Sequence, residues 1–230
     1  MLPLKYAYLF ASSLFLIPWL ILYIIRKDLR REMKIVSLII GIAGVLAESF
    51  LYTQDWVKPI TITGTKVGLE DFILGFASGG SASVIYKVIF HKFNYKIISY
   101  KISHWKLALP LLFIITLTCL LFYQFKIFSF WANCISLLIG LLFMSALRKD
   151  LIKEMLSGGF LLMLISLPIY WLTYFLFPLW QQSYWHHNRL SGFFLFYIPI
   201  EDIIWWLLAG AFAAVIYDYW FSYRIQQKAY

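Results

Sequence analysis

The sequence predicts an all-α, polytopic membrane protein in which seven transmembrane helices form two parallel three-helix repeats joined by a linker helix. The composition of the chain, the spacing of its apolar runs and a repeated sequence pattern support this prediction. Hydrophobic residues make up 62% of the 230 residues and charged residues 13%, whereas about a quarter of a soluble domain is charged. Aromatic residues reach 20%, more than interfacial belts of tryptophan and tyrosine require. The composition therefore excludes an ordinary soluble domain.

Seven apolar runs are long enough to cross a bilayer, since a transmembrane helix needs about 20 residues. They lie at about 6–25, 35–53, 69–89, 107–123, 127–147, 158–177 and 198–220. The first run continues to Ile25 and meets Arg26 and Lys27 without a small-residue cleavage site, so we expect a retained helix rather than a signal peptide. Cys119 and Cys134 both lie in apolar runs and are expected to be buried thiols rather than a disulfide.

The distribution of positive charge predicts the orientation of the helices. If seven runs cross the membrane, alternate connections share a side, and fifteen of the twenty lysine and arginine residues fall on one of them. That side holds Arg26, Lys27, Arg30, Arg31, Lys34, Lys87, Lys92, Lys96, Lys101, Lys106, Arg148, Lys149, Lys153, Arg224 and Lys228, and the other holds Lys5, Lys58, Lys66, Lys126 and Arg189. Since cytoplasmic connections are enriched in positive residues, we expect a plasma-membrane protein with its N-terminus outside and its C-terminus in the cytoplasm. The net charge of +9 thus indicates membrane topology rather than a nucleic-acid partner.

Two pairs of segments indicate an internal repeat. Residues 26–33 read RKDLRREM and residues 148–155 read RKDLIKEM, an offset of 122, and both are expected to be cytoplasmic turns whose charges hold the topology. Residues 69–87 (LEDFILGFASGGSASVIYK) align with residues 200–218 (IEDIIWWLLAGAFAAVIYD) at an offset of 131. Because a single helix separates the two copies, both run in the same direction. The predicted parts are a first three-helix repeat at 1–90, a basic linker with the linker helix at 91–126, and a second three-helix repeat at 127–230.

Two acidic pairs head equivalent helices of the two repeats. Glu70 and Asp71 open one apolar run, and Glu201 and Asp202 open the other. An uncompensated charge inside a bilayer costs about 2.5 to 3.5 kcal/mol, so acids at these places indicate function. We expect the pairs at equal height near the outer ends of their helices, with a site between the repeats. The alternative is carboxylates that only complement the positive end of the helix dipole at the headgroup level.

Glu48, in the stretch GVLAESFLYT, is a lone acid inside the second apolar run. By the offset of 122, its counterpart in the second repeat is Tyr170. An acid in one repeat only indicates asymmetric chemistry, and a carboxyl group facing a water-filled crevice is the alternative.

Tryptophans accompany the second acidic pair. Trp205 lies four residues after Glu201 and Trp206 four after Asp202, so each acid has an indole on its own helix face. An indole face stabilises a nearby cation by about 2 kcal/mol when water is excluded. Acids that deliver a proton beside such rings suit carbocation chemistry on a hydrocarbon. Packing against lipid or the protein core is the alternative role for these tryptophans.

The corresponding helix of the first repeat carries small residues in place of indoles. Gly75 and Gly79 form a GxxxG pattern, which predicts close packing against another helix. At the other ends of these helices, Lys87 and Asp218 occupy equivalent positions, and the repeat predicts a structural ion pair between them across its pseudo-twofold axis.

No other motif indicates a cofactor. His186 and His187 are neighbours in the outer loop before the last helix, without the further ligands of a metal site, so an interfacial loop is favoured over a metal site. The chain has no glycine-rich phosphate loop and no GxGxxG pattern. We therefore expect neither a metal nor a dinucleotide.

The stretch NRLSGFFLFYIPIEDIIWW, residues 188–206, resembles the second-half signature of the integral-membrane lycopene cyclases of the fused or two-subunit carotenoid type. In that family a Pro-x-Glu-Glu/Asp motif precedes an aromatic-rich helix. Pro199, Glu201 and Asp202 match this motif position by position.

The first half resembles the other subunit of the same family, so the resemblance covers nearly the whole chain. It has a basic segment after the first helix, an acid in the second helix, a loop with Trp56, and then an acidic pair. It departs at Gly68, where the family usually has a proline two residues before its first glutamate.

The resemblance implies a cyclase that acts on the linear ends of a carotene without net redox change and without a cofactor. A carboxylic acid would protonate a terminal double bond, a second double bond would capture the cation to close a six-membered ring, and a base would remove a proton. The donor needs a raised pKa, which an apolar setting and a neighbouring acid supply. The implied partners are a lipid-soluble polyene delivered from the bilayer and other enzymes of the carotenoid pathway. The implied site comprises Glu201 as general acid, then Asp202 and Glu70, with Glu48 and Asp71 in support, Trp205 and Trp206 as a cation-stabilising wall, and Trp56 and Pro199 as further substrate-binding residues.

Other classes of membrane protein share parts of this pattern. Small sugar transporters of the SWEET type also have a three-plus-one-plus-three parallel repeat, and the acids could form a proton-coupled transport site. That family carries a Pro-Gln pair, and none of the seven prolines here precedes glutamine. A retinal photoreceptor needs a lysine inside the last helix, and residues 198–220 contain none. A carotenoid-binding relative without catalysis is the third alternative.

Overall fold

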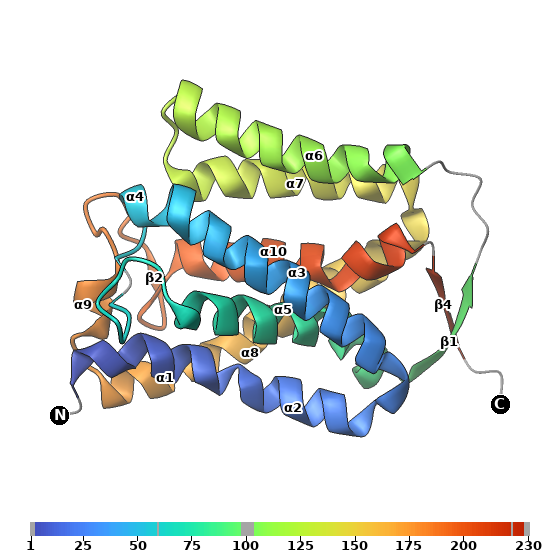
Figure 1. The fold of residues 1–230 in the computed structure, drawn as a ribbon, viewed down its shortest axis with the longest axis horizontal. Helices are drawn as coiled ribbons and strands as arrows, with labels where there is room; N and C mark the ends of the chain where they lie inside the picture. The colour runs from blue at the N-terminus through green and yellow to red at the C-terminus, as the bar shows by residue number, and fades with distance from the viewer. Residues whose placement is uncertain (1–2, 59, 98–103, 222, 228–230) are drawn as a thin grey trace.

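The structure, a computed structural model, describes residues 3–58, 60–97, 104–221 and 223–227 and consists of long helices aligned along one direction (Figure 1). The helices are η1 (Leu4–Tyr6), α1 (Ala7–Leu14), α2 (Leu16–Ile25), η2 (Lys27–Leu29), α3 (Arg30–Ala47), η3 (Glu48–Tyr52), α4 (Thr53–Asp55), α5 (Leu69–Ile89), α6 (His104–Cys119), η4 (Leu120–Gln124), α7 (Ser129–Leu147), η5 (Lys149–Leu151), α8 (Ile152–Leu176), α9 (Trp180–Tyr184) and α10 (Ile200–Trp220). The strands are β1 (Lys92–Ile97), β2 (Phe194–Leu195), β3 (Ile198–Pro199) and β4 (Tyr223–Gln227).

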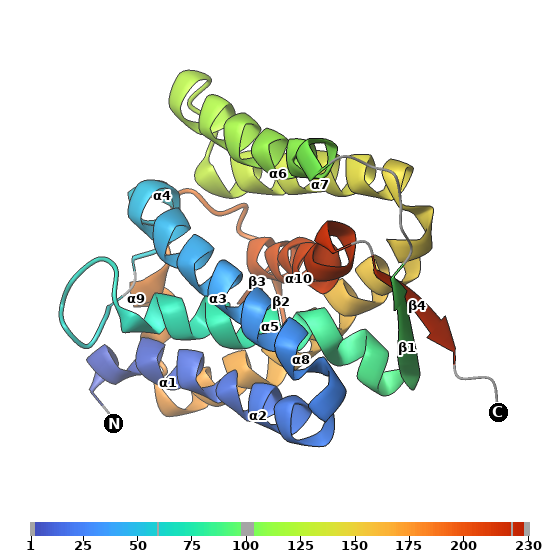
Figure 2. The same ribbon diagram turned by 45° about the vertical axis from the view of Figure 1, so that its right-hand side comes forward.

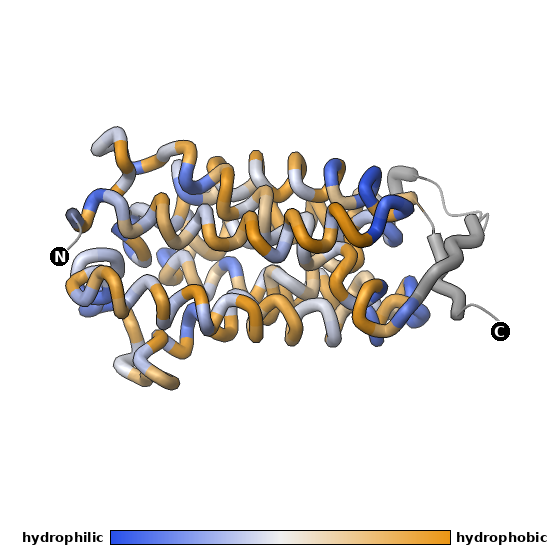
Figure 3. The backbone as a smooth tube through the Cα atoms, turned by 90° about the horizontal axis from the view of Figure 1, so that it is seen from below, coloured by the Kyte–Doolittle hydropathy of each residue, from blue (hydrophilic) through white to orange (hydrophobic). Residues whose placement is uncertain are grey.

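Within the described residues, six helical stretches are long and apolar enough to cross a membrane: Leu4–Ile25, Lys27–Asp55, Leu69–Ile89, Ser129–Leu147, Lys149–Leu176 and Ile200–Trp220. The seventh predicted run corresponds to the shorter apolar helix Ala108–Gln124. Hydrophilic residues gather at the two ends of the bundle, and hydrophobic residues dominate its middle (Figure 3). The predicted all-α membrane fold is therefore confirmed, whereas its organisation as seven helices in two repeats stays a prediction.

The central helices are α5 and α10. α3 packs along α5 and α8 along α10, while α1 and α2 cover α5, and the α6–α7 pair lies against α10 (Figures 1 and 2). Glycines allow the contact between α3 and α5, because a Cβ atom on Gly75 would lie 2.6 Å from the carbonyl oxygen of Ile40. A Cβ atom on Gly79 would lie 2.6 Å from the Ile40 side chain. The predicted close packing of the GxxxG face is confirmed.

We call the end of the bundle that carries the β1–β4 sheet the basic end, and the opposite end, where α5 and α10 begin, the acidic end (Figure 1). At the basic end Lys87 is fully buried and forms ion pairs with Glu32 at 2.5 Å, Asp218 at 2.8 Å and Glu154 at 3.2 Å. These residues come from α5, α3, α10 and α8, so one ammonium group joins four helices. The predicted Lys87–Asp218 pair is confirmed, and the two glutamates extend it.

The same cluster explains where α3 and α8 begin. The apolar runs predicted starts near residues 35 and 158, but the helices begin at Arg30 and Ile152. Glu32 and Glu154 lie in their first turns and are buried at 3% and 1% exposure. Because these acids are paired with Lys87, the polar turns join the helices rather than remaining outside them.

Two arginines make equivalent contacts in the two halves. Arg26 donates from Nη1 to the carbonyl oxygen of Lys87 at 3.1 Å, and Arg148 donates in the same way to the carbonyl oxygen of Asp218 at 3.1 Å. Each also forms a two-point contact with the aspartate two residues after it. Both arginines are buried because they satisfy carbonyl groups at the ends of α5 and α10, and the topological role expected for these turns stays a prediction.

Three further points concern the linker, the sheets and the thiols. Residues 98–103 of the predicted linker, Lys101 among them, and Lys228 of the basic set lie outside the described residues. The β1–β4 and β2–β3 pairings were not predicted. Cys119 and Cys134 are both free, as predicted, but only Cys134 is buried, since Cys119 lies on an outward face of the bundle.

Candidate functional site

The two acidic pairs lie at the acidic end, in the first turns of α5 and α10 (Figure 1). Glu70, Asp71, Glu201 and Asp202 are 0–3% exposed. Glu48, at 8% exposure, is the fifth buried acid of this region. Among the residues that the structure describes, none of these five carboxyl groups forms an ion pair. Among the described residues, these carboxyl groups therefore depend on bound protons or on hydrogen-bond donors, rather than on lysine or arginine, for stabilisation.

The two glutamates hold the loops that precede their helices. Glu70 Oε1 accepts a hydrogen bond from the backbone N–H of Ile62 at 2.6 Å, and Glu201 Oε1 accepts one from the backbone N–H of Ser191 at 2.6 Å. The Oε2 atom of each glutamate is buried without a hydrogen-bond partner in the described part of the chain. The shared geometry indicates a common positioning role in the two halves.

Asp71 is held by one side chain and one backbone group. Its Oδ1 atom accepts from the hydroxyl of Tyr8 at 2.5 Å, and its Oδ2 atom accepts from the backbone N–H of Gly68 at 2.7 Å. A proline at position 68 would lack this N–H. Gly68, which stands before α5 where Pro199 stands before α10, thus adds a hydrogen bond that caps α5 and fixes Asp71.

Asp202 is enclosed by aromatic residues. Its Oδ2 atom accepts from the hydroxyl of Tyr170 at 2.7 Å, and its Oδ1 atom accepts from Nε1 of Trp185 at 3.1 Å. Trp206 donates from Nε1 to the oxygen of the same Tyr170 hydroxyl at 3.1 Å. This chain of bonds connects α10, α8 and the loop after α9, and it fixes the orientation of the Tyr170 hydroxyl.

Glu48 differs from both aspartates. It begins η3, a π-helical turn at the end of α3, and such turns are frequent at functional sites. Its Oε2 atom is buried and has no hydrogen-bond partner among the described residues. One turn on, Tyr52 accepts a hydrogen bond from Nε1 of Trp205 at 3.1 Å. Glu48 is thus a buried acid without a donor to stabilise its charge.

A small cavity of about 30 Å³ lies between the helices of the two halves at this end. Its walls are Tyr8, Ala11, Phe15, Leu74, Ile169, Tyr170, Trp180, Tyr184 and Trp206. A cavity of this volume has room for a few water molecules but not for a carotene end group. Two of its wall residues, Tyr8 and Tyr170, are the tyrosines that donate to Asp71 and Asp202.

Tyr184, another wall residue of the cavity, lies against Tyr8, with ring centroids 5.3 Å apart. Burial, above all, raises the pKa of the Tyr184 hydroxyl well above its usual value. Tyr184 therefore belongs to the aromatic shell that contains the tyrosine bonded to Asp71.

The four predicted substrate-binding residues differ in their position relative to the cavity. Trp206 lines the cavity and stacks on Phe15 with a centroid separation of 4.8 Å. Trp205 and Trp56 contact each other edge to face at 6.1 Å, and neither is itself a wall residue, although the ring of Trp205 packs on that of Trp206 at 5.0 Å. Pro199 lies in β3 and pairs with Phe194.

Sequence reasoning missed the aromatic residues that surround the acids. They are Tyr8, Trp180, Tyr184 and Trp185, from α1, α9 and the loop after α9. The aromatic fraction of 20% was the available signal, but it does not say which rings meet.

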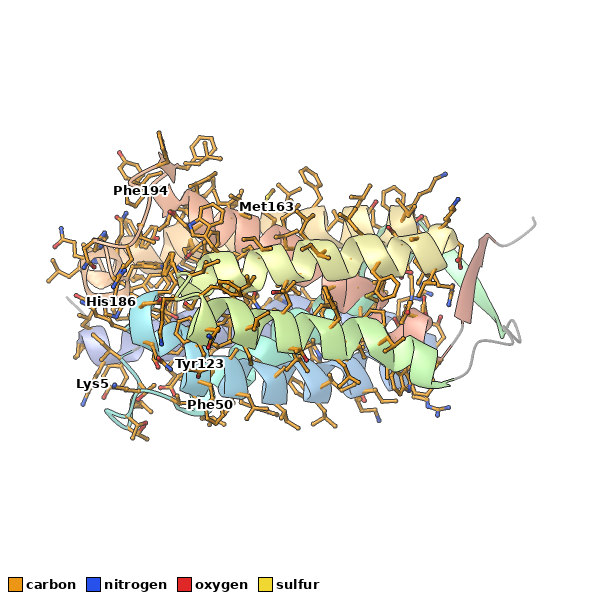
Figure 4. All side chains as sticks on the ribbon, turned by 90° about the horizontal axis from the view of Figure 1, so that it is seen from above. Lys5, Phe50, Tyr123, Met163, His186 and Phe194 are labelled. Carbon is orange, nitrogen blue, oxygen red and sulfur yellow. The ribbon has the colours of Figure 1, made fainter. Side chains whose placement is uncertain are left out.

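His186 and His187 lie in the loop at the acidic end, where Figure 4 labels His186. Burial, followed by the charge of Lys58, lowers the pKa of His186. His187 Nε2 lies 2.9 Å from the carbonyl oxygen of Gln181. In the described part of the chain, no group of three or more histidine, cysteine, aspartate or glutamate side chains is arranged to hold a metal ion.

Comparison with known proteins gives one match. The family model described as lycopene cyclase matches residues 129–220, which run from α7 to the end of α10 and include Asp202, Tyr170, Trp185 and Trp206. No curated protein and no solved structure matches the chain.

Proposed function

We propose that this chain, whose residues 129–220 match the lycopene cyclase family model, is a member of that family and forms a ring at the linear end of a carotene by proton-initiated cyclisation. The observation that carries the proposal is that two buried aspartates, Asp71 and Asp202, accept hydrogen bonds from tyrosines that line an aromatic cavity. A third acid, Glu48, is buried at the same end of the bundle, and none of the three is ion-paired among the described residues. Such a site suits a hydrocarbon that has no group for a charged residue to bind and that reacts through a cation.

The three acids suit different roles in the reaction. Two donated hydrogen bonds stabilise the carboxylate of Asp202. Glu48 Oε2 is buried and has no donor among the described residues, which favours the neutral acid. We therefore assign Glu48 as the proton donor and Asp202 as the proton acceptor, with Asp71 beside Glu48 in support. Paired acids whose surroundings separate their protonation states are a common basis for acid–base catalysis.

The reaction then balances without a cofactor. The neutral carboxyl group of Glu48 gives its proton to the terminal carbon–carbon double bond, and the next suitable double bond attacks the resulting cation to form the new ring bond. The Asp202 carboxylate removes a proton from the ring, which restores a double bond. One proton enters and one leaves the hydrocarbon, so the product is an isomer of the substrate.

The aromatic walls stabilise the positive charge between these steps. Trp206 and Trp180 line the cavity, and an indole face attracts a desolvated cation by about 2 kcal/mol. The hydrogen bond from Trp206 to Tyr170 holds this ring beside Asp202.

Glu201 and Glu70 have a positioning role in this proposal. Sequence resemblance predicted Glu201 as the general acid, but its Oε1 atom holds the loop at Ser191, and Glu70 does the same at Ile62. We retain both glutamates as part of the site because they fix the first turns from which Asp202 and Asp71 project.

The wider organisation is part of the same proposal. The matching contacts of Arg26 and Arg148, and of Glu70 and Glu201, support two parallel repeats related by a pseudo-twofold axis. The excess of positive residues in one set of connections supports a plasma-membrane location with the N-terminus outside.

Product analysis in a bacterial host that accumulates lycopene tests the proposed reaction. The wild-type chain is expected to give a pigment of unchanged mass and shorter-wavelength absorbance, which chromatography with absorbance and mass detection resolves. Glu48→Gln and Asp202→Asn are each expected to lower its formation by about 100-fold or more, since general acid–base groups contribute about 10²–10⁴-fold. Unchanged lycopene with well-inserted wild-type protein would contradict lycopene cyclisation. Retained pigment binding without conversion would indicate a carotenoid-binding relative.

A further inference from the structure

The segment before α10 is an exposed, uncharged aromatic hairpin. β2 and β3 pair with each other, and the five residues Phe193, Phe194, Leu195, Phe196 and Tyr197 are 74%, 43%, 45%, 60% and 78% exposed. Residues 190–200 contain no charged side chain. Figure 4 shows Phe194 projecting from the side of the bundle at its acidic end. We refer to residues 193–197 as the aromatic hairpin.

The aromatic hairpin is held in a defined conformation. The backbone N–H of Ile200 donates to the carbonyl oxygen of Phe193 at 3.0 Å, and Glu201 fixes the base of the hairpin through Ser191. Phe196 and Tyr197 have φ angles of 52° and 67°, a region that bulky residues rarely occupy. Surrounding contacts must hold this backbone, because it costs about 1–3 kcal/mol for each such residue.

Those contacts come from the elements that wall the cavity. Trp171 donates from Nε1 to the carbonyl oxygen of Phe196 at 3.0 Å, and Gln181 donates from Nε2 to the carbonyl oxygen of Tyr197 at 3.1 Å. Trp171 and Gln181 directly follow two cavity-lining residues in the sequence, Tyr170 and Trp180. The hairpin is therefore attached to α8 and α9 next to the cavity walls.

The hairpin also continues the apolar outer face of α8. The ring of Phe196 meets that of Trp171 edge to face at 5.9 Å. Trp171 and Phe175 are 44% and 80% exposed on a helix that is long and apolar enough to span a membrane. The exposed apolar surface thus runs without a break from α8 onto the hairpin.

The equivalent loop before α5 has the opposite chemistry. Residues 60–67 include Thr61, Thr63 and Thr65, whose hydroxyl groups lie within hydrogen-bond distance of one another, and the exposed Lys66. Both loops are fixed by a glutamate, yet the segment 190–200 before α10 is uncharged and aromatic, whereas residues 60–67 are not. The two loops have the same glutamate anchor but different exposed side chains. This difference indicates that the loop before α5 faces water and that the hairpin before α10 faces lipid.

We propose that the aromatic hairpin is inserted among the acyl chains of the bilayer. We propose also that a hydrocarbon passes from the lipid toward the cavity on the side of the molecule that carries this hairpin. The second part rests on the proposed cyclase function. Tyrosine and phenylalanine at this level suit the boundary between headgroups and acyl chains. The cavity of about 30 Å³ must widen to take the end of a polyene, and a hairpin bonded to α8 and α9 connects the lipid to the two elements that would move.

Spin-label accessibility tests the insertion independently of any activity. Phe194→Cys and Thr63→Cys, each made in a Cys119→Ser, Cys134→Ala background, would be labelled with a nitroxide and reconstituted into phosphatidylcholine vesicles. The label at position 194 is expected to collide more with oxygen, which partitions into lipid, and the label at position 63 more with a water-soluble nickel chelate. A label at position 194 that is as accessible to the nickel chelate as the label at position 63 would overturn the proposal.

Matched charge insertions test the passage of substrate. Phe194→Asp and Thr63→Asp both place a carboxylate at an exposed loop position. At limiting lycopene in vesicles, Phe194→Asp is expected to lower the initial rate by about tenfold because a charge is costly in lipid, while Thr63→Asp stays within about twofold of wild type. At saturating lycopene the two variants are expected to converge. Equal slowing at limiting substrate, or a loss at saturation that is confined to Phe194→Asp, would overturn the passage role. An inactive wild type would contradict the cyclase function but not the lipid contact, which the label position measures by itself.

Discussion

The two ends of the bundle bury the same kind of side chain in different ways. At the basic end, Glu32, Glu154 and Asp218 surround the ammonium group of Lys87. At the acidic end, Asp71 and Asp202 accept hydrogen bonds from two tyrosines of the cavity wall, and Glu48 is buried in the same region. None of these three acids forms an ion pair in the described part of the chain. The first arrangement fixes carboxylates permanently, and the second leaves carboxyl groups able to gain and lose a proton.

The difference shows why buried acids alone do not identify a reactive site. A buried carboxylate beside a cation forms a pair whose rupture is costly, and such a pair contributes mainly to the unique arrangement of the helices. A buried carboxyl group that meets only hydroxyl and indole donors can change its charge during a reaction. Four helices meet at Lys87, so the basic end holds these helices together, while the chemistry that we propose belongs to the acidic end.

Removing the cation at the basic end is expected to have the largest effect, a loss of protein stability. Lys87→Met leaves three buried carboxyl groups without their common partner, which is expected to cost about 3–5 kcal/mol of stability. Thermal unfolding of the purified protein in detergent measures the loss as a fall in Tm of roughly 10 °C. Lys149→Met, at an exposed lysine of the same end, is the control and is expected to leave Tm nearly unchanged. Equal Tm values for the two variants would contradict the structural role of Lys87.

A smaller effect is expected when one donor at the acidic end is removed. Tyr170→Phe takes one hydrogen bond from Asp202 and leaves Nε1 of Trp206 without its acceptor, so the rate of carotene conversion is expected to fall about tenfold. Tyr174→Phe is the matched control, because the Tyr174 hydroxyl is buried on the same helix without a hydrogen-bond partner among the described residues. If both variants lose activity equally, the Tyr170–Asp202 contact has no special role.

The smallest effect on conversion is expected from substituting Glu201, to which we assign a positioning role rather than proton transfer. Glu201→Gln keeps a side-chain oxygen that can accept from Ser191, so conversion is expected to stay within about threefold of wild type, whereas Glu201→Leu loses that bond and should fall further. Initial rates in membranes with equal amounts of inserted protein measure the difference. Complete loss with Glu201→Gln would instead support the general-acid role that the sequence resemblance implies.

The sequence predicted the features that depend on local pattern. The lengths of the apolar runs predict the helices, and the alignment of two segments 131 residues apart predicts the pairing of Lys87 with Asp218. The acidic pairs were likewise expected at equivalent helix starts. Each of these features follows from residue order along one helix or from the offset between two helices.

Contacts between distant residues could not be predicted in the same way. The bond from Tyr8 to Asp71 joins residues 63 positions apart, and the bond from Trp185 to Asp202 depends on how the loop after α9 folds back over α10. Adjacent acids also share one sequence motif, yet Glu201 binds a loop while Asp202 meets the aromatic site. Side-chain direction within the first helical turn decides this division, and the motif does not encode it visibly.

Deuterium incorporation tests most directly the central claim that a protein carboxyl group starts the reaction with a proton. Carboxyl protons exchange with solvent, so conversion of lycopene by the wild-type protein in D₂O is expected to place one deuterium atom in each new ring, which mass spectrometry of the purified pigment detects. Glu48→Gln and Asp202→Asn should yield almost no such product. A cyclised pigment that carries no solvent deuterium, formed at the same rate by the wild type and by Glu48→Gln, would contradict proton-initiated cyclisation at this site.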